Sequence, residues 1–151
     1  MRPLILFQHK KYEELTLKEA HDIFAIRSEV FVVEQDCVYQ DIDGKDPKAL
    51  HITGTYESKN IAYARIFDKN IIYNNHIAIG RILVCKEKRS QQIGHDLVDY
   101  CLKTIKNNFT KSPIKISAQA HLELFYNHHG FQKKGDDYLE DGIPHISMFI
   151  E

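Results

Sequence analysis

Residues 77–98 read IAIGRILVCKEKRSQQIGHDLV, an apolar run followed by a polar stretch and the start of a periodic segment. The run over 77–84 predicts a long strand, and the apolar side chains over 93–105 fall on one face at the spacing of a helix. A strand that leads through a loop into a helix leaves the first N–H groups of that helix free to bind an anion. This stretch therefore predicts a strand–loop–helix unit and a candidate phosphate-binding turn.

The loop itself has few of the glycines that usually line a phosphate-binding turn. Ser90 is expected to cap a helix that begins at Gln91, and Lys88 and Arg89 add positive charge at the same end. The single glycine is Gly94. By pattern alone, a phosphate cradle and an ordinary surface turn with solvated charges are equally good interpretations.

The N-terminal third predicts a short strand, a helix and a long loop. Residues 4–7 form an apolar run that suits a strand, and Thr16 with Glu19 makes a capping box for a helix that extends to about Val33. Residues 34–50, EQDCVYQDIDGKDPKAL, are polar and lack periodicity. A loop of that length is typical of a binding loop or a lid.

The remaining segments predict strands and one short helix. Residues 51–56 and 61–67 are separated by turn residues and predict a hairpin, while residues 114–120 alternate apolar and polar side chains as a half-buried strand does. A short helix is expected over 122–129, before a glycine. A loop that reads DDYLEDGIP then leads to a last strand over 145–150. Helices mixed with hairpins indicate the α/β class in the broad sense (α+β), with a mixed sheet.

Composition and charge indicate an ordinary globular protein. Of the 151 residues, 43% are hydrophobic and 27% are charged, and the formal net charge is -1. This balance gives no bulk attraction to nucleic acid or to an anionic membrane, and the N-terminal apolar stretch is too short for a signal peptide or a membrane span. Three widely spaced cysteines favour reduced thiols. We expect a single domain over residues 1–151, in the cytoplasm, with no nucleic-acid or membrane partner.

A second motif lies downstream, where residues 125–131 read FYNHHGF. The two phenylalanines suit core packing. Tyr126 suits the core as well, but a phenol beside a thiol could act as a general acid. The adjacent His128 and His129 do not face one metal together on a helix, so no metal site is expected.

The chain resembles members of the GNAT superfamily of N-acetyltransferases. The first GNAT element, a strand–loop–helix with the pattern Gln/Arg-x-x-Gly-x-Gly/Ala, is matched at Arg89 and Gly94, with Gln92 in the position of the first glycine, and the second, a block that ends Phe-Tyr…Gly-Phe, is matched over 125–131. The likeness is closer to the ElaA-type subgroup, whose stretches are nearly reproduced in RSEVFVVEQDCVYQDIDGKD, AYARI, IGRILV, SAQAHLELFYNHHGF and YLEDGIPHISM. The resemblance covers most of the chain.

This resemblance implies a mixed, mostly antiparallel twisted sheet flanked by about four helices, and it implies acetyl-CoA as the cosubstrate, without a metal. It places the pantetheine arm along a strand and the pyrophosphate at the first turn of a helix. The implied cofactor site comprises the strand residues Ile82, Leu83 and Val84, the loop residues Arg89, Ser90, Gln91, Gln92, Ile93, Gly94 and His95, and further along the chain Gln119 and Tyr126.

Four residues depart from the family's pattern. Gln92 and Ser90 stand where GNAT proteins commonly have glycine, Gln119 where asparagine is common, and Leu122 where alanine is common. The loop keeps its backbone donors, because every residue other than proline supplies an N–H group. We therefore expect the loop to bind pyrophosphate with the side chain of Gln92 turned away from the phosphates.

The resemblance further implies direct transfer of an acetyl group from acetyl-CoA to a primary amine on a small molecule or a peptide. A backbone N–H near Ile82 would polarise the thioester carbonyl, and Tyr126 would protonate the departing thiolate. The general base stays open among Glu34, His121 and His145.

The acceptor site is expected between the loop over 34–46 and the loop over 138–145. Both carry carboxylates that suit a cationic amine, although each acid alone could equally serve only to solvate its loop: Glu34, Asp36, Asp41, Asp43, Glu140 and Asp141. The alternative function is a non-catalytic acyl-CoA-binding module on the same fold. Whether the chain forms a homodimer is left open.

Overall fold

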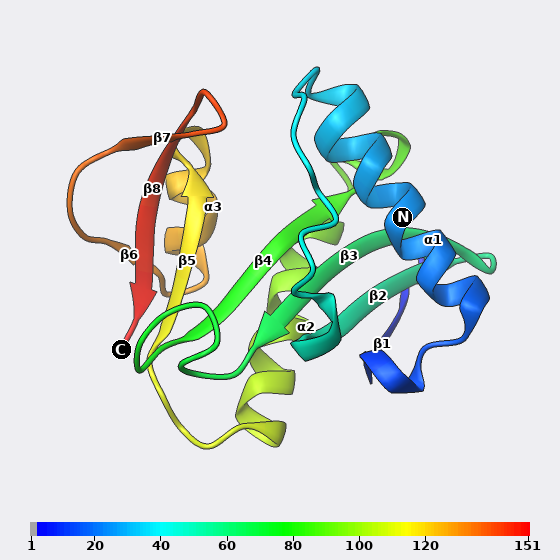
Figure 1. Cartoon of the computed structure of the whole chain (residues 1–151), viewed down its shortest axis with the longest axis horizontal. Coiled ribbons are helices and arrows are strands. Elements are labelled where there is room, and N and C mark those ends of the chain that lie inside the picture. Colours follow the sequence, from blue (N-terminus) through cyan, green and yellow to red (C-terminus); the bar gives the residue numbers. More distant parts are fainter. Residues whose placement is uncertain (1–2) are drawn as a thin grey trace.

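The computed structural model describes residues 3–151, which form one mixed sheet with helices on both of its faces (Figure 1). The strands are β1 (Leu6–Lys11), β2 (Leu50–Tyr56), β3 (Lys59–Phe67), β4 (Ile77–Val84), β5 (Ile114–Gln119), β6 (Gln132–Lys133), β7 (Tyr138–Glu140) and β8 (Ile143–Ile150). The α-helices are α1 (Leu17–Arg27), α2 (Ile93–Asn108) and α3 (Glu123–His128). The strand order is β1-β2-β3-β4-β5-β8-β6, with β7 paired to β8.

The predicted fold class is confirmed. All neighbouring strands are antiparallel except β4 and β5, so the sheet is mixed and mostly antiparallel. Within residues 3–151 the helices number three α-helices rather than about four, since a π-helical segment over Ser28–Glu34 continues α1 directly. The helix predicted to reach Val33 is therefore present, with a change of hydrogen-bonding pattern after Arg27.

Two sequence predictions of strand structure need correction. The first strand is β1, which extends into polar residues instead of occupying residues 4–7, because its backbone pairs with β2 from Leu6 to Lys11 at the edge of the sheet. The segment expected as the loop DDYLEDGIP is largely a hairpin of β7 and β8. Its turn residues Asp141 and Gly142 both have positive φ, 51° and 78°, as a two-residue hairpin turn of an Asp-Gly pair requires.

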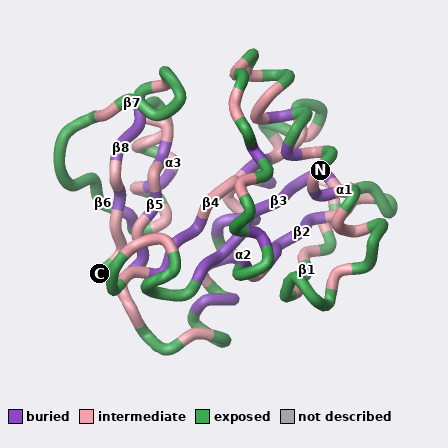
Figure 2. Tube along the Cα trace, in the orientation of Figure 1, coloured by how far each residue is buried: buried purple, intermediate pink, exposed green. Residues whose placement is uncertain are grey.

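The core lies on both faces of β3 and β4, and β3 is buried along most of its length (Figure 2). On one face α2 packs its predicted apolar stripe against β3 and β4, and the stripe's buried members are Ile93, Leu97, Val98, Cys101 and Ile105. On the other face Ile23 of α1 and Val30 pack against Tyr63 and Leu83. Since side chains alternate along a strand, each of these two strands contributes to both layers.

The sheet opens in its middle, between β4 and β5. These parallel neighbours pair only at Ile77 with Ile114 and at Ala78 with Lys115, and then diverge (Figure 1). A bulge on β4 accompanies the opening: the register with β3 passes from Leu83 to Gly80 with one extra residue, and Arg81 has a φ of 49°. The β4 backbone beyond Ala78 therefore faces an opening in place of a neighbouring strand.

Ion pairs fix the long loop after the π-helical segment onto the sheet. Arg27, which is fully buried, donates to Asp41 at 2.9 Å and to Asp46 at 2.6 Å. Arg65 of β3 donates to Asp46 at 2.9 Å and to Asp43 at 2.6 Å. Three aspartates of the loop thus bind arginines of α1 and the sheet, and the segment predicted to be a binding loop or a lid is held in place by buried charge.

His51 connects this network to the core through two hydrogen bonds, and it makes the free energy of unfolding depend on pH. Its Nε2–H donates to the Asp46 carbonyl at 3.0 Å, and its Nδ1 accepts from the Tyr63 hydroxyl at 2.6 Å. Burial lowers the pKa of His51 below its ordinary value of 6.5. The unfolded chain therefore takes up a proton at a higher pH than the folded chain does, so this contribution to stability is present above pH 6.5 and is lost as the pH falls below it.

We expect the free energy of unfolding to fall between pH 7.5 and pH 5.5, and to fall less in His51→Gln. Glutamine keeps one donor and one acceptor but does not titrate, and the difference between the two slopes is at most about 1.4 kcal/mol over one pH unit. Urea denaturation at the two pH values measures this. Equal losses in wild type and variant would show that His51 is not responsible.

Candidate active site

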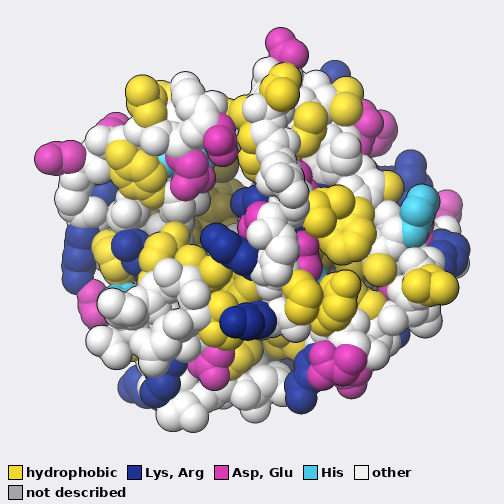
Figure 3. Space-filling view, in the orientation of Figure 1, with side chains coloured by type: hydrophobic (Ala, Val, Ile, Leu, Met, Phe, Trp, Pro, Cys, Tyr) yellow, Lys and Arg dark blue, Asp and Glu magenta, His cyan; other side chains and the backbone are white. Residues whose placement is uncertain are grey.

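A cavity of about 410 Å³ occupies the opening between β4 and β5. Figure 3 shows this face of the molecule hollowed between the end that carries β7 and the segment after the π-helix. Its apolar and aromatic lining residues include Phe31, Phe67, Ile72, Tyr73 and Ile143. The cavity also reaches Tyr126, so it extends from the loop side of the sheet to α3.

Tyr126 stands at the α3 end of this cavity beside Gln119 and Leu122. Its ring is 6% exposed and packs edge-on against Phe125 and Phe131, with ring centroids 5.0 Å and 5.9 Å away. Burial raises the pKa of the Tyr126 phenol well above its ordinary value of 10. The hydroxyl is therefore neutral throughout the physiological pH range and keeps a proton to donate.

The loop before α2 has a conformation that the sequence did not predict. The helix begins at Ile93 rather than Gln91, and Ser90 is not its cap, because Ser90 and Gln92 both adopt left-handed backbone, with φ of 65° and 66°. Left-handed backbone favours glycine, and glycine is what the resemblance implies at these two positions. The loop thus keeps a glycine-type path with serine and glutamine in place of glycine.

Gly94 has a different role from that of a turn glycine. It lies inside α2, and a Cβ there would meet the ring of Phe125 at 3.4 Å. That distance is an ordinary van der Waals contact, so packing against Phe125 does not by itself require glycine here. His95 next to it stacks on Phe125 with centroids 4.5 Å apart and bonds to His129 of the same region at 2.8 Å, so its side chain is engaged with α3 while its backbone belongs to the first turn.

The left-handed backbone at Gln92 leads to a test of the loop. Glycine at this position relieves about 1 kcal/mol or more of backbone strain, although it also makes the unfolded chain more flexible. We therefore expect Gln92→Gly to leave the free energy of unfolding and the affinity for coenzyme A unchanged or to raise them. Gln92→Val is expected to lower the free energy of unfolding by roughly 1–2 kcal/mol, because a β-branched residue tolerates positive φ poorly. Thermal denaturation and calorimetric titration with coenzyme A measure both. A marked loss of affinity in Gln92→Gly would mean that the glutamine side chain itself contacts the cofactor.

The strand residues of the predicted cofactor site face different layers. Leu83 is buried in the α1-side cluster, whereas Ile82 and Val84 are half-buried against the α2-side core, and Ile82 lines the cavity. The Nε–H of Arg89 donates to the Val84 carbonyl at 3.0 Å. The same guanidinium forms an ion pair with Glu34 at 2.5 Å. Arg89 thus links the end of β4 to the π-helical segment.

The three candidate bases occupy different environments. Glu34 is held by Arg89, and His121 is exposed and lies outside the cavity lining. His145 is buried in β8, lines the cavity, and pairs across the sheet with Gln119. Its Nδ1–H donates to the Ile143 carbonyl at 2.7 Å, which leaves the lone pair on Nε2. The structure therefore brings only His145 of the three into the cavity with Tyr126.

Of the six carboxylates expected to bind the acceptor, Glu34 and Asp36 lie outside the cavity lining, and the other four divide into two groups. Asp41 and Asp43 are engaged by arginines, and Arg81 donates to Asp41 at 2.7 Å. Burial alone would raise the pKa of Asp43, but the Arg65 guanidinium outweighs it and holds that pKa well below the ordinary value of 3.8. These two acids therefore fix the loop and are not open to a cationic ligand, which corrects the expectation for them.

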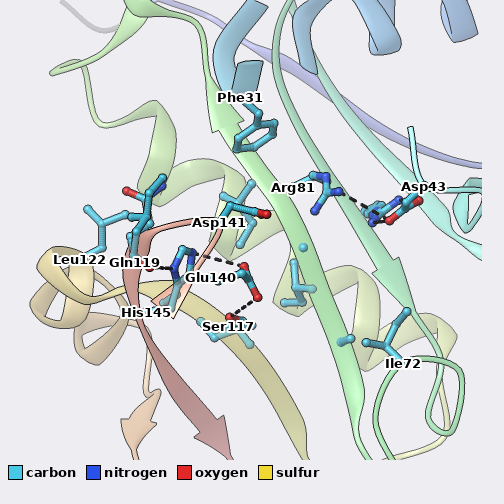
Figure 4. A pocket seen from close by; sticks show the side chains of 18 of the residues that line it. Phe31, Asp43, Ile72, Arg81, Ser117, Gln119, Leu122, Glu140, Asp141 and His145 are labelled. Atoms are coloured by element: carbon cyan, nitrogen blue, oxygen red, sulfur yellow. Dashed lines mark hydrogen bonds and ion pairs between the residues drawn. The ribbon is translucent and has the colours of Figure 1, made fainter. Parts of the chain in front are cut away.

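Glu140 and Asp141 form the second group and line the cavity from the β7–β8 hairpin. Figure 4 shows Glu140 between His145 and Ser117, across the opening from Arg81 and Asp43. Ser117 donates to Glu140 at 3.3 Å and makes a short hydrogen bond with the Tyr138 hydroxyl. The roles of Ser117 and Tyr138 were missed from the sequence. The alternation of 114–120 and the Asp-Gly pair of the hairpin were the available signals for them.

The family model described as "Acetyltransferase (GNAT) domain" matches residues 9–151. The chain belongs to the GNAT acetyltransferase family. Within it the chain is of the ElaA type: it is 38% identical to Protein ElaA of Escherichia coli over 150 residues, which cover 98% of this chain and 97% of ElaA.

Solved structures of similar proteins share this fold. The crystal structure of E. coli ElaA has a TM-score of 0.91 over 98% of this chain and all of that chain, at 36% identity. An acyl-CoA N-acyltransferase from Pseudomonas aeruginosa has the same TM-score and identity, over 97% of this chain and 99% of its own. A GNAT family acetyltransferase from Elizabethkingia anophelis with acetyl-CoA bound shares the fold, with a TM-score of 0.68 at 16% identity over 97% of each chain.

Neither a group of metal-ligating side chains nor a membrane-spanning helix is present among the described residues. Within residues 3–151 no three His, Cys, Asp or Glu side chains are grouped so that they could hold a metal ion. In the same part of the chain no helix is long and apolar enough to cross a membrane.

Proposed function

We propose that this protein is an acetyl-CoA-dependent N-acetyltransferase that moves an acetyl group directly to a primary amine. The observation that carries the proposal is the opening between β4 and β5, which places Tyr126 and His145 in one cavity with the exposed backbone of β4. A thioester held there would have a proton donor for its sulfur and a base for the acceptor. Its acetyl donor is supported by the family and by the fold neighbour solved with acetyl-CoA.

Binding of the cosubstrate would use backbone more than side chains. On the side that faces β5, β4 has no strand partner beyond Ala78 within residues 3–151, so this edge can pair with the pantetheine amides as an added strand would. The first-turn N–H groups of α2 and the left-handed loop before it would hold the pyrophosphate. The bulge at Arg81 supports a role for the neighbouring backbone N–H in polarising the thioester carbonyl.

The chemistry assigned to side chains is proton transfer. The Nε2 of His145 takes one proton from the ammonium, and the freed lone pair of the amine attacks the acetyl carbon. As the C–S bond breaks, Tyr126 gives its proton to the thiolate and recovers one from the amide nitrogen. Overall, an ammonium and acetyl-CoA yield an N-acetyl amide, free coenzyme A and one proton. His145 is preferred to Glu34 and His121, because neither of those is free within the cavity.

The alternative, a non-catalytic acyl-CoA-binding module on this fold, predicts tight binding without turnover. A thiol-release assay with acetyl-CoA and a panel of primary amines separates the two, with mass spectrometry of the amide product as the second readout. We expect saturable release that requires the amine. Tight coenzyme A binding with no amide from any amine would overturn the proposed function. We place this activity in the cytoplasm.

A further inference from the structure

Most of the charge around the cavity is already neutralised within the protein. Arg27, Arg65 and Arg81 are matched by Asp41, Asp43 and Asp46, through contacts of 2.6 to 3.6 Å. On the opposite wall the β7–β8 hairpin presents two carboxylates, Glu140 and Asp141. The side chain of Glu140 is half-exposed, and its polar contacts within residues 3–151 are the Ser117 hydroxyl at 3.3 Å and the His145 Nε2 at 3.4 Å. A carboxylate on this wall is therefore open to a ligand.

When His145 is neutral, no proton lies between its Nε2 and the carboxylate of Glu140. The Nδ1–H of His145 is committed to the Ile143 carbonyl, so its Nε2 is an acceptor, and it lies 3.4 Å from the Glu140 Oε2, which is also an acceptor. Two acceptors that face each other are stabilised by a donor placed between them. A primary ammonium has three N–H donors and can bond to both atoms at once.

We infer that Glu140 and His145 together form the ammonium-binding site of the acceptor, and that the acceptor is an alkylamine, positively charged at neutral pH, rather than a neutral arylamine. This inference rests on the proposed function and specifies its substrate class. Glu140 binds the ammonium and holds it against the Nε2 of His145, which removes one proton. Phe31, Phe67 and Tyr73, which also line the cavity, offer aromatic surface to the rest of the acceptor.

Two isomers provide a matched pair of probes. 2-Phenylethylamine carries an alkylammonium, whereas 4-ethylaniline has the same atoms but is uncharged at pH 7.5. In Glu140→Gln, kcat/KM for 2-phenylethylamine is expected to fall on the order of 10- to 100-fold, because a hydrogen bond between two charged groups is lost. For 4-ethylaniline the expected change is within about threefold, since only neutral hydrogen bonds are involved.

Asp141→Asn is the matched control. It removes one negative charge from the adjacent residue of the same cavity wall, and asparagine tolerates the positive φ of 51° there. A smaller loss in this variant than in Glu140→Gln would support a specific contact. Equal losses in the two variants, or equal losses for the two isomers, would overturn the inference while leaving the transferase activity in place. Absence of turnover by the wild type with every amine would instead overturn the proposed function, and the inference with it.

Discussion

Tyr126→Phe is expected to lower kcat for acetyl transfer by roughly 10²- to 10⁴-fold, the range of a lost general acid. The ring keeps its packing against Phe125 and Phe131, so coenzyme A affinity and thermal stability should change little. Because burial raises the pKa of Tyr126 above its ordinary value of 10, the wild-type rate should not decline through ionisation of this phenol below that pH. Steady-state kinetics with saturating acetyl-CoA measure the loss.

Tyr100→Phe provides the control for removing a hydroxyl. The Tyr100 hydroxyl bonds to His9 at 2.9 Å and is not part of the cavity lining, so this variant should retain wild-type kinetics. A Tyr126→Phe enzyme with near-wild-type kcat would show that the thiolate leaves without help from this residue.

The largest effect on stability is expected from Arg27→Met. Methionine retains much of the buried stem but leaves Asp41 and Asp46 each without one of their arginine partners. Breaking a buried ion pair from one side costs about 3–5 kcal/mol, which corresponds to a fall in Tm on the order of 10 °C for a chain of this size. Because those aspartates anchor the loop that carries Tyr39 and Lys45 of the cavity wall, amine KM should rise as well.

Lys18→Met removes an ion pair of another kind. Lys18 contacts Asp22 at 2.6 Å on the surface of α1, with 79% of the lysine side chain exposed. A surface pair contributes little, so the expected change in the free energy of unfolding is within about 0.5 kcal/mol. Similar small effects in Arg27→Met and Lys18→Met would contradict the structural role given to the loop network.

The sequence predicted the parts of the site that local pattern controls. The strand over 77–84 and the apolar face over 93–105 are local, because periodicity depends only on neighbours along the chain, and both are present. The alternation in 114–120 correctly placed Ile116 and Ala118 on the buried face and Ser117 on the other. The pattern of helices and hairpins already indicated a mixed sheet, and the resemblance added that the sheet is mostly antiparallel, as it is.

Other features depend on contacts between distant residues. The pairs of Arg27 with Asp46 and of Arg81 with Asp41 join positions 19 and 40 residues apart, and nothing in the local sequence distinguishes these aspartates from solvated ones. Ser90 looked like a helix cap, but the loop needs left-handed backbone there, and tertiary packing decides that conformation. The β7–β8 hairpin could have been predicted from its Asp-Gly turn.

The most direct test of the central claim is a crystal structure of the protein with coenzyme A bound. We predict that the pantetheine arm lies along β4 in the opening toward β5, with the pyrophosphate at residues 89–95 and the thiol sulfur within hydrogen-bond distance of the Tyr126 Oη. Coenzyme A bound elsewhere on the chain, or in the opening with its sulfur remote from Tyr126, would contradict the claim that this cavity is the site of acetyl transfer.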